Sequence, residues 1–168
     1  MKKYIIIIFV VVFYSRSSGQ NNMNEDSLRK YFLEYHDSLN PLEGIWEVSA
    51  TTEIYHFDTL YNVNTSAGRY RLAIVIENGK ARIHNLSKDS LSMVFLLTDV
   101  KGVYLYKNFY SQINQYSKPH AVICKSDEME YTFDTPAELL KLTNGNEFIE
   151  GLREVNVMVW KKTQPQIK

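Results

Sequence analysis

The chain has 168 residues and a formal net charge of zero, because 19 basic side chains balance 19 acidic ones. This balance excludes a strongly basic surface of the kind that binds nucleic acid or an anionic membrane. The length is that of one domain with a sizeable core. Twelve Tyr, eight Phe and two Trp are a heavy aromatic load, which favours β-structure, where such side chains pack well.

The first residues have the layout of a secretory signal peptide. Met1-Lys2-Lys3 is a basic start, the run from Tyr4 to Tyr14 is apolar, and small polar residues follow it. The apolar run is shorter than the roughly 20 residues that a retained membrane anchor needs. We therefore expect residues 1–19 to be removed near Gly19. The mature chain would be secreted or periplasmic, with no integral membrane span.

The cysteine content fits an exported domain that is stabilised by its hydrophobic core without a disulfide bond. The single cysteine, Cys124, excludes an internal disulfide. It lies in the apolar run 121–124, which predicts a buried, inert thiol. No cysteine follows the apolar run of the signal peptide, so a lipid anchor is not expected.

A tail and a helix are predicted over residues 20–40. Asp26 or Ser27 is a suitable N-cap, and Asn40-Pro41 ends the helical pattern, so the helix would run to about Leu39. Apolar residues recur at helical spacing and form one stripe: Leu28, Tyr31, Phe32, Tyr35 and Leu39. We expect this helix to lie against the rest of the fold or to cover one of its ends.

Strand patterns follow at short intervals over residues 41–163. The tightest predicted turn is Asn78-Gly79, the strongest short hairpin signal. Residues 58–66 are polar and are interpreted as a loop, 136–142 as a short helix, and 164–168 as a tail. Eight strands are predicted, at 44–57, 69–77, 80–86, 91–98, 103–109, 120–125, 129–134 and 154–162.

The predicted fold class is mainly β, an eight-stranded antiparallel up-and-down barrel with an N-terminal helix and a short helix before the last strand. Strands that follow one another without intervening helices argue against βαβ units. Closure of the sheet would remove exposed edges. A β-sandwich is the structural alternative.

A Gly-x-Trp tripeptide, Gly44-Ile45-Trp46, stands at the entrance to the first predicted strand. With a helix before it and a long strand after it, this motif resembles the opening signature of the lipocalins and related calycin barrels. The resemblance implies that Trp46 closes the barrel floor and that Gly44 lets the backbone pass close by. It also implies a small apolar ligand in or at the barrel.

The resemblance extends to the end of the last strand. In a closed meander that strand pairs with the first, which would bring Trp160, Lys161 and Lys162 next to Trp46. In lipocalins a basic side chain from this region packs over the signature Trp, usually an Arg; here Lys161 or Lys162 would do so as a cation–π contact. Residues 41–46 and 159–165 also resemble secreted proteins of the Bacteroidetes type, which implies a compartment rather than an activity.

Alternation places a set of large apolar and aromatic side chains on one face of the predicted strands. If the barrel holds a ligand, they are its candidate lining: Val48, Ala50, Leu72, Ile74, Phe95, Tyr104, Tyr106, Tyr131 and Phe133. If the barrel is filled, they are its core. Four residues near strand ends would either line a mouth or be ordinary rim residues: Tyr55, His56, Tyr61 and Tyr110.

No pattern in the chain indicates catalysis. The four histidines share no metal-ligand spacing, and neither a Gly-rich phosphate loop nor a Gly-x-Ser-x-Gly motif occurs. We expect no enzyme activity, no metal and no cofactor. Two functions remain: an exported barrel that binds a small apolar molecule, and an interaction module with a solid core that binds another protein of the cell envelope.

Asp-Ser/Thr-Leu occurs four times, beginning at residues 26, 37, 58 and 89. The tripeptide resembles the O-glycosylation signal of secreted Bacteroides-type proteins, which implies glycans on Ser27, Thr59 or Ser90. Ser38 is the weakest candidate because it falls inside the predicted helix. The alternative is that Asp-Ser and Asp-Thr cap helices and open turns here.

Overall fold

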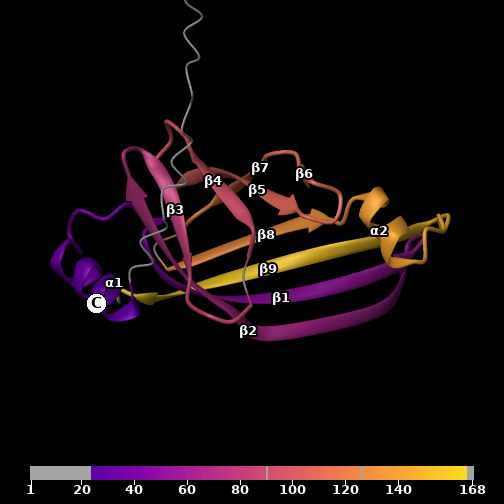
Figure 1. The fold of residues 1–168 in the computed structure, drawn as a ribbon, viewed down its shortest axis with the longest axis horizontal. Helices are drawn as coiled ribbons and strands as arrows, with labels where there is room; N and C mark the ends of the chain where they lie inside the picture. Colours follow the sequence, from indigo (N-terminus) through magenta and orange to yellow (C-terminus); the bar gives the residue numbers. More distant parts are fainter. Residues whose placement is uncertain (1–23, 90, 126, 166–168) are drawn as a thin grey trace, which may run out of the picture.

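Residues 24–89, 91–125 and 127–165 are described by a computed structural model; the predicted signal peptide and Ser90 lie outside them. These residues form two helices and nine strands (Figure 1). In chain order they are α1 (Glu25–Glu34), β1 (Gly44–His56), β2 (Thr59–Glu77), β3 (Lys80–Asn85), β4 (Met93–Leu97), β5 (Val103–Tyr110), β6 (Gln115–Tyr116), β7 (His120–Ile123), β8 (Glu128–Asp134), α2 (Ala137–Thr143) and β9 (Leu152–Gln164).

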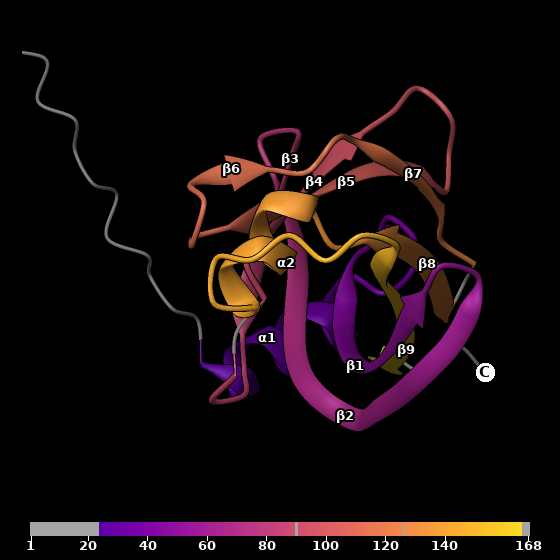
Figure 2. The same ribbon diagram turned by 90° about the vertical axis from the view of Figure 1, so that its right-hand side faces the viewer.

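The strands form two antiparallel sheets. The larger is a half-barrel with the order β3-β2-β1-β9-β8, and in the smaller β5 pairs with β4, β6 and β7. β3 lies beside β4, and β7 beside β8. Apart from the short β6, the strands therefore follow one another around a common core in the order of a meander (Figure 2).

The fold is mainly β, with a helix at the N-terminus and a short helix before the last strand, as predicted. The count of eight strands in one barrel is not confirmed, because the described residues form nine strands in two sheets. The extra strand is β6, a two-residue strand paired with the end of β5.

The interpretation of residues 58–66 as a loop is wrong. β2 begins at Thr59 and pairs with β1 from Thr59 to Ser66, with one irregularity in the register at Tyr61. Its polar side chains are exposed, so burial imposes no alternation there. The turn is made by Phe57, which has a positive φ of 53° and donates its backbone N–H to the Gly151 carbonyl at 2.6 Å.

The predicted bounds of the first helix are also wrong. α1 begins two or three residues earlier, because Asn24 rather than Asp26 or Ser27 is the N-cap and accepts the Ser27 backbone N–H at 2.8 Å. It ends at Glu34, not near Leu39. No described helix is long and apolar enough to cross a membrane.

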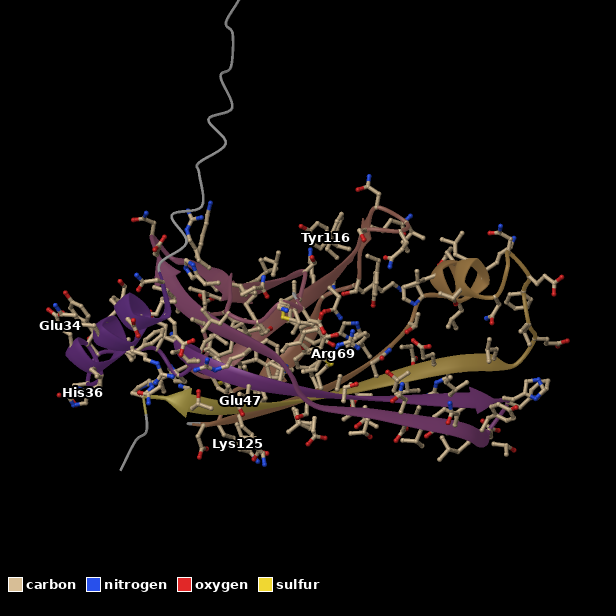
Figure 3. The ribbon with its side chains drawn as sticks, turned by 60° about the horizontal axis from the view of Figure 1, so that its bottom comes forward. Glu34, His36, Glu47, Arg69, Tyr116 and Lys125 are labelled. Carbon is tan, nitrogen blue, oxygen red and sulfur yellow. The ribbon has the colours of Figure 1, made fainter. Side chains whose placement is uncertain are left out.

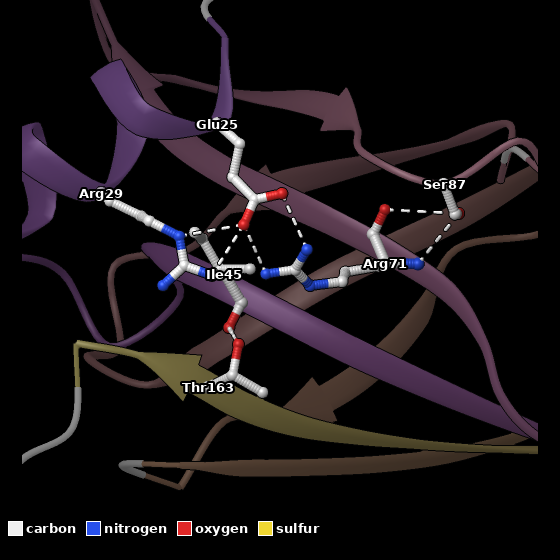
Figure 4. Close-up of polar contacts among 6 residues, drawn as sticks. All are labelled: Glu25, Arg29, Ile45, Arg71, Ser87 and Thr163. Atoms are coloured by element: carbon white, nitrogen blue, oxygen red, sulfur yellow. Dashed lines mark hydrogen bonds and ion pairs between the residues drawn. The ribbon is translucent and has the colours of Figure 1, made fainter.

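An ion-pair cluster fastens α1 to the larger sheet (Figure 4). The Glu25 carboxylate accepts hydrogen bonds from Arg71 of β2 at 2.6 and 2.7 Å and from Arg29 at 2.7 and 2.9 Å. Beneath the cluster, Leu28 and Phe32 are fully buried against the outer face of β1 and β2. The helix thus braces the outside of the half-barrel.

Candidate functional site

The end of the fold next to α1 is closed by Trp46. Its side chain is fully buried, and its indole N–H donates to the Leu42 carbonyl at 2.9 Å. The Trp160 ring meets it edge-on, with centroids 6.2 Å apart. Trp46 is therefore a packed floor between the first and last strands.

Lys162 packs over this floor. Its Nζ lies 4.8 Å from the centre of the Trp46 ring and donates to the Pro41 carbonyl at 2.6 Å. Burial lowers the pKa of Lys162, because the charged form loses its hydration. Lys161, the other candidate, is exposed and lies opposite Glu47 on the next strand.

Gly44 begins the first strand with a φ of 147°. A Cβ atom at this position would lie 2.4 Å from the Gln164 carbonyl oxygen, so the close pairing of β1 with the end of β9 needs a residue without a side chain. The structure thus brings together Gly44, Trp46, Trp160 and Lys162 at one end of the fold.

Above the floor, the candidate lining residues form a tightly packed core. All nine belong to one hydrophobic cluster or pack against it: Val48, Ala50, Leu72, Ile74, Phe95, Tyr104, Tyr106, Tyr131 and Phe133. The Tyr106 and Tyr131 ring centroids are 3.9 Å apart. Burial raises the pKa of Tyr104 to about 12, and burial also raises the pKa of Tyr106 and of Tyr131.

A chain of polar side chains continues from this core towards α2. Thr52 donates to the Asn156 amide oxygen at 2.9 Å, and the Asn156 amide nitrogen donates to Thr135 at 2.9 Å. Thr135 in turn donates to the Glu154 carboxylate. Thr52 and Asn156 are directly opposite each other on β1 and β9, so the inner face changes from apolar to polar along the strands.

This polar chain leads to a hollow lined by residues of α2. The helix α2 lies at the end of the fold opposite α1 (Figure 1). The hollow has a volume of about 360 Å³. Its lining combines apolar side chains with three polar ones: Ile54, Tyr61, Leu140, Ile149 and Leu152, with Thr143, Asn144 and Glu154. A smaller hollow of about 210 Å³ adjoins it and is lined by Ile54, His56, Tyr61 and Leu152.

We call these two hollows together the mouth. Of the four residues predicted near strand ends, His56 and Tyr61 line it. The sequence analysis missed Glu154, Leu140 and Leu152, although Glu154 and Asn156 lie on the same face of the last strand as the inner residues Met158 and Trp160. Polar residues at inner positions of a strand are the signal that marks this end of the fold.

Two candidate glycosylation positions are exposed. Ser27 lies in the first turn of α1, and Thr59 is the first residue of β2. Asp26 and Ser27 do not cap α1, because the Ser27 backbone N–H is itself bound by the Asn24 cap.

Comparison with family models, with curated proteins and with solved structures gives no match. Function is therefore argued from the geometry of the chain itself.

Proposed function

We propose that this protein is an exported, lipocalin-like barrel that binds one small apolar molecule at the mouth. The observation that carries the proposal is the hollow of about 360 Å³ beneath α2. Its size is within the range of small-molecule sites, and an apolar lining with a few polar groups is their usual composition. The lipocalin-like floor at the other end supports the same assignment.

The packing of the interior favours the mouth over the barrel centre as the binding position. The centre is filled by aromatic rings in contact, so a ligand there would have to displace them. At the mouth, Ile54 and Leu152 are only partly buried and Tyr61 is 82% exposed. Covering these side chains would add hydrophobic free energy of about 25 cal/mol per Å² of apolar surface.

The lining also suggests how a ligand would be oriented. The Glu154 carboxylate is held by Thr135 at the inner end of the mouth, and apolar side chains surround the outer part. A ligand with one hydrogen-bond donor and an apolar body would place the donor towards Glu154. The body would then lie against Ile54 and Leu152, beneath α2.

The test is displacement of the fluorescent probe N-phenyl-1-naphthylamine by straight-chain alcohols, amines and fatty acids of increasing length. We expect saturable probe binding that alcohols or amines displace better than fatty acids, because a second carboxylate would repel Glu154. Leu152→Asp places a charge in both hollows and should weaken probe binding about tenfold or more. Leu33→Asp makes the same change on α1, where Leu33 is 64% exposed, and should leave binding unchanged. Equal binding by both variants would reject the mouth as the site.

A further inference from the structure

The first half of β2 is an edge of the larger sheet. β3 pairs with β2 only over residues 72–77, and the backbone that follows β3 bonds to Arg71 of β2. Over residues 59–70, β1 is the only strand among the described residues that pairs with β2. This part of β2 follows the lower rim of the molecule in both ribbon views (Figures 1 and 2).

The neighbouring strands fix the direction in which the backbone groups of this edge point. Hydrogen bonds of an antiparallel strand alternate in direction from one residue to the next. In β9 the Lys162 N–H donates away from β1, to the Asp127 carbonyl at 2.8 Å, so Lys161 bonds to its β1 partner Glu47. The register of β1 with β9 is regular from residue 46 to residue 56. The backbone groups of Thr52 in β1 therefore point to β2.

Two residues of the edge consequently have free backbone groups. Asn64 lies opposite Thr52 and bonds to β1, and the register of the two strands is regular over residues 62–66. The N–H and C=O groups of Val63 and Thr65 therefore point away from β1. No ladder and no backbone hydrogen bond between described residues pairs them there. Both residues are exposed, so another strand can reach them.

The edge lacks the side chains that usually prevent strand association. Residues 59–68 contain no Lys, Arg, Asp, Glu or Pro, whereas exposed edges normally carry charges or proline. Leu60, Tyr61 and Val63 also expose apolar surface there. The first charged residue after the segment is Arg69, which pairs with Asp89 at 3.0 Å and lies near the middle of the molecule (Figure 3). The segment is therefore an unprotected template for one more strand.

A second copy of the chain is the partner that fits this edge. A two-fold axis beside Asn64 places Val63 of each copy opposite Thr65 of the other, so all the outward N–H and C=O groups of these residues pair. The side chains that meet are neutral and β-branched, and such pairs are favourable across strands. Self-pairing brings no like charges together within the segment. The formal net charge of zero adds no long-range repulsion between copies.

We propose that the protein forms a two-fold symmetric dimer in which β2 pairs with β2 of a second copy, antiparallel, over residues 62–66. The larger sheets of the two copies are then continuous, and each copy covers the exposed edge of the other. Because the paired segment is short, the dimer is weak and reversible. Val63 and Thr65 line neither hollow of the mouth, so dimerisation is a role separate from ligand binding.

The test is sedimentation equilibrium over about 5–500 μM protein, which measures the dimerisation constant. Thr65→Pro removes an outward donor but none that faces β1, and should weaken dimerisation about tenfold or more. Thr65→Ala also loses the side-chain contact with Thr51, but it keeps the N–H and should dimerise like the parent protein. Circular dichroism checks that both variants are folded. A parent protein that stays monomeric, or equal dimerisation of the two variants, would overturn the proposal.

Opposite charges at Val63 test the two-fold arrangement without proline. In the dimer the two copies of residue 63 are diagonal neighbours, within reach of long side chains. Val63→Lys and Val63→Glu should each dimerise about tenfold or more weakly than the parent protein, and their equimolar mixture should recover dimerisation. A mixture no more dimeric than either variant alone would reject this pairing of β2 with β2.

Amide hydrogen exchange by NMR locates the contact. In dilute protein the amides of Val63 and Thr65 should exchange quickly, whereas that of Asn64, which bonds to β1, should exchange slowly. A higher protein concentration should slow the first two. Exchange that does not change while the protein dimerises would place the interface elsewhere, and slow exchange in dilute protein would mean that the edge is already covered within one copy. Either result contradicts the proposal.

Discussion

Replacement of Trp46 tests whether the floor is a packed structural element. The side chain is fully buried, contacts Trp160 edge-on, lies under Lys162 and donates to the Leu42 carbonyl. Truncation of a buried Trp to Ala costs about 3–5 kcal/mol, and the unpaired Leu42 carbonyl adds about 1 kcal/mol. We expect Trp46→Ala to lower the free energy of unfolding by about 4–6 kcal/mol, a large part of the 5–15 kcal/mol typical of a domain.

The assay is urea unfolding followed by far-ultraviolet circular dichroism, because tryptophan fluorescence would itself change with the substitution. Trp46→Phe keeps most of the buried ring but loses the indole donor, so it should fall between the parent protein and Trp46→Ala. Leu33→Ala is the control, since Leu33 is 64% exposed on α1, and should change stability by less than about 0.5 kcal/mol. A Trp46→Ala variant as stable as this control would refute the floor argument.

Three further predictions concern single side chains. Lys162→Met should lower the free energy of unfolding in urea by about 1–2 kcal/mol, because the contact with the Trp46 ring and the hydrogen bond to the Pro41 carbonyl are lost. The control Lys161→Met should lower it by less than about 0.5 kcal/mol. Equal losses for the two variants would contradict the assignment of Lys162 to the Trp46 ring. Hydrogen bonds from Arg71, and to a lesser extent from Arg29, hold the pKa of Glu25 below its usual 4.5. The stability that Glu25 adds is therefore present above pH 4.5 and is lost as the pH falls through the lower folded-state pKa. Thermal unfolding of Glu25→Gln should thus differ from the parent protein at pH 6 and converge with it under acid conditions; a constant difference would contradict this. Burial raises the pKa of Cys124 to about 11, so at pH 8 a disulfide reagent should label it only in the urea-unfolded protein; rapid labelling of the native protein would contradict its burial.

The sequence predicted best where burial or turn chemistry restricts the residue type. Asn78-Gly79 was predicted as a tight hairpin turn, and both residues have positive φ, 51° and 72°. Trp46 and Trp160 could be expected to meet because a first and a last strand that pair bring their ends together. Each of these features has a recognisable local sequence pattern.

Other features of the fold have no recognisable local sequence pattern. Residues 59–66 extend β2 with polar and apolar side chains that are mostly exposed to solvent, so no hydrophobic period identifies the strand. Phe57 turns the chain at positive φ, where an aromatic residue is uncommon.

The candidate site shows the same division. The apolar alternation identified the nine inner residues but could not distinguish a filled core from a cavity, which depends on how rings from different strands meet. The mouth combines β1, β2 and β9 with α2 and the loop that follows it. Its residues become neighbours only when α2 folds over the ends of the long strands.

The most direct test of the proposed function is the native mass of the protein, purified from a bacterial host, beside its denatured mass. The proposal predicts additional mass that disappears on denaturation and that is missing from the Leu152→Asp variant, while Leu33→Asp retains it. The mass of the bare chain under both conditions, together with no displaceable probe binding, would contradict a ligand at the mouth.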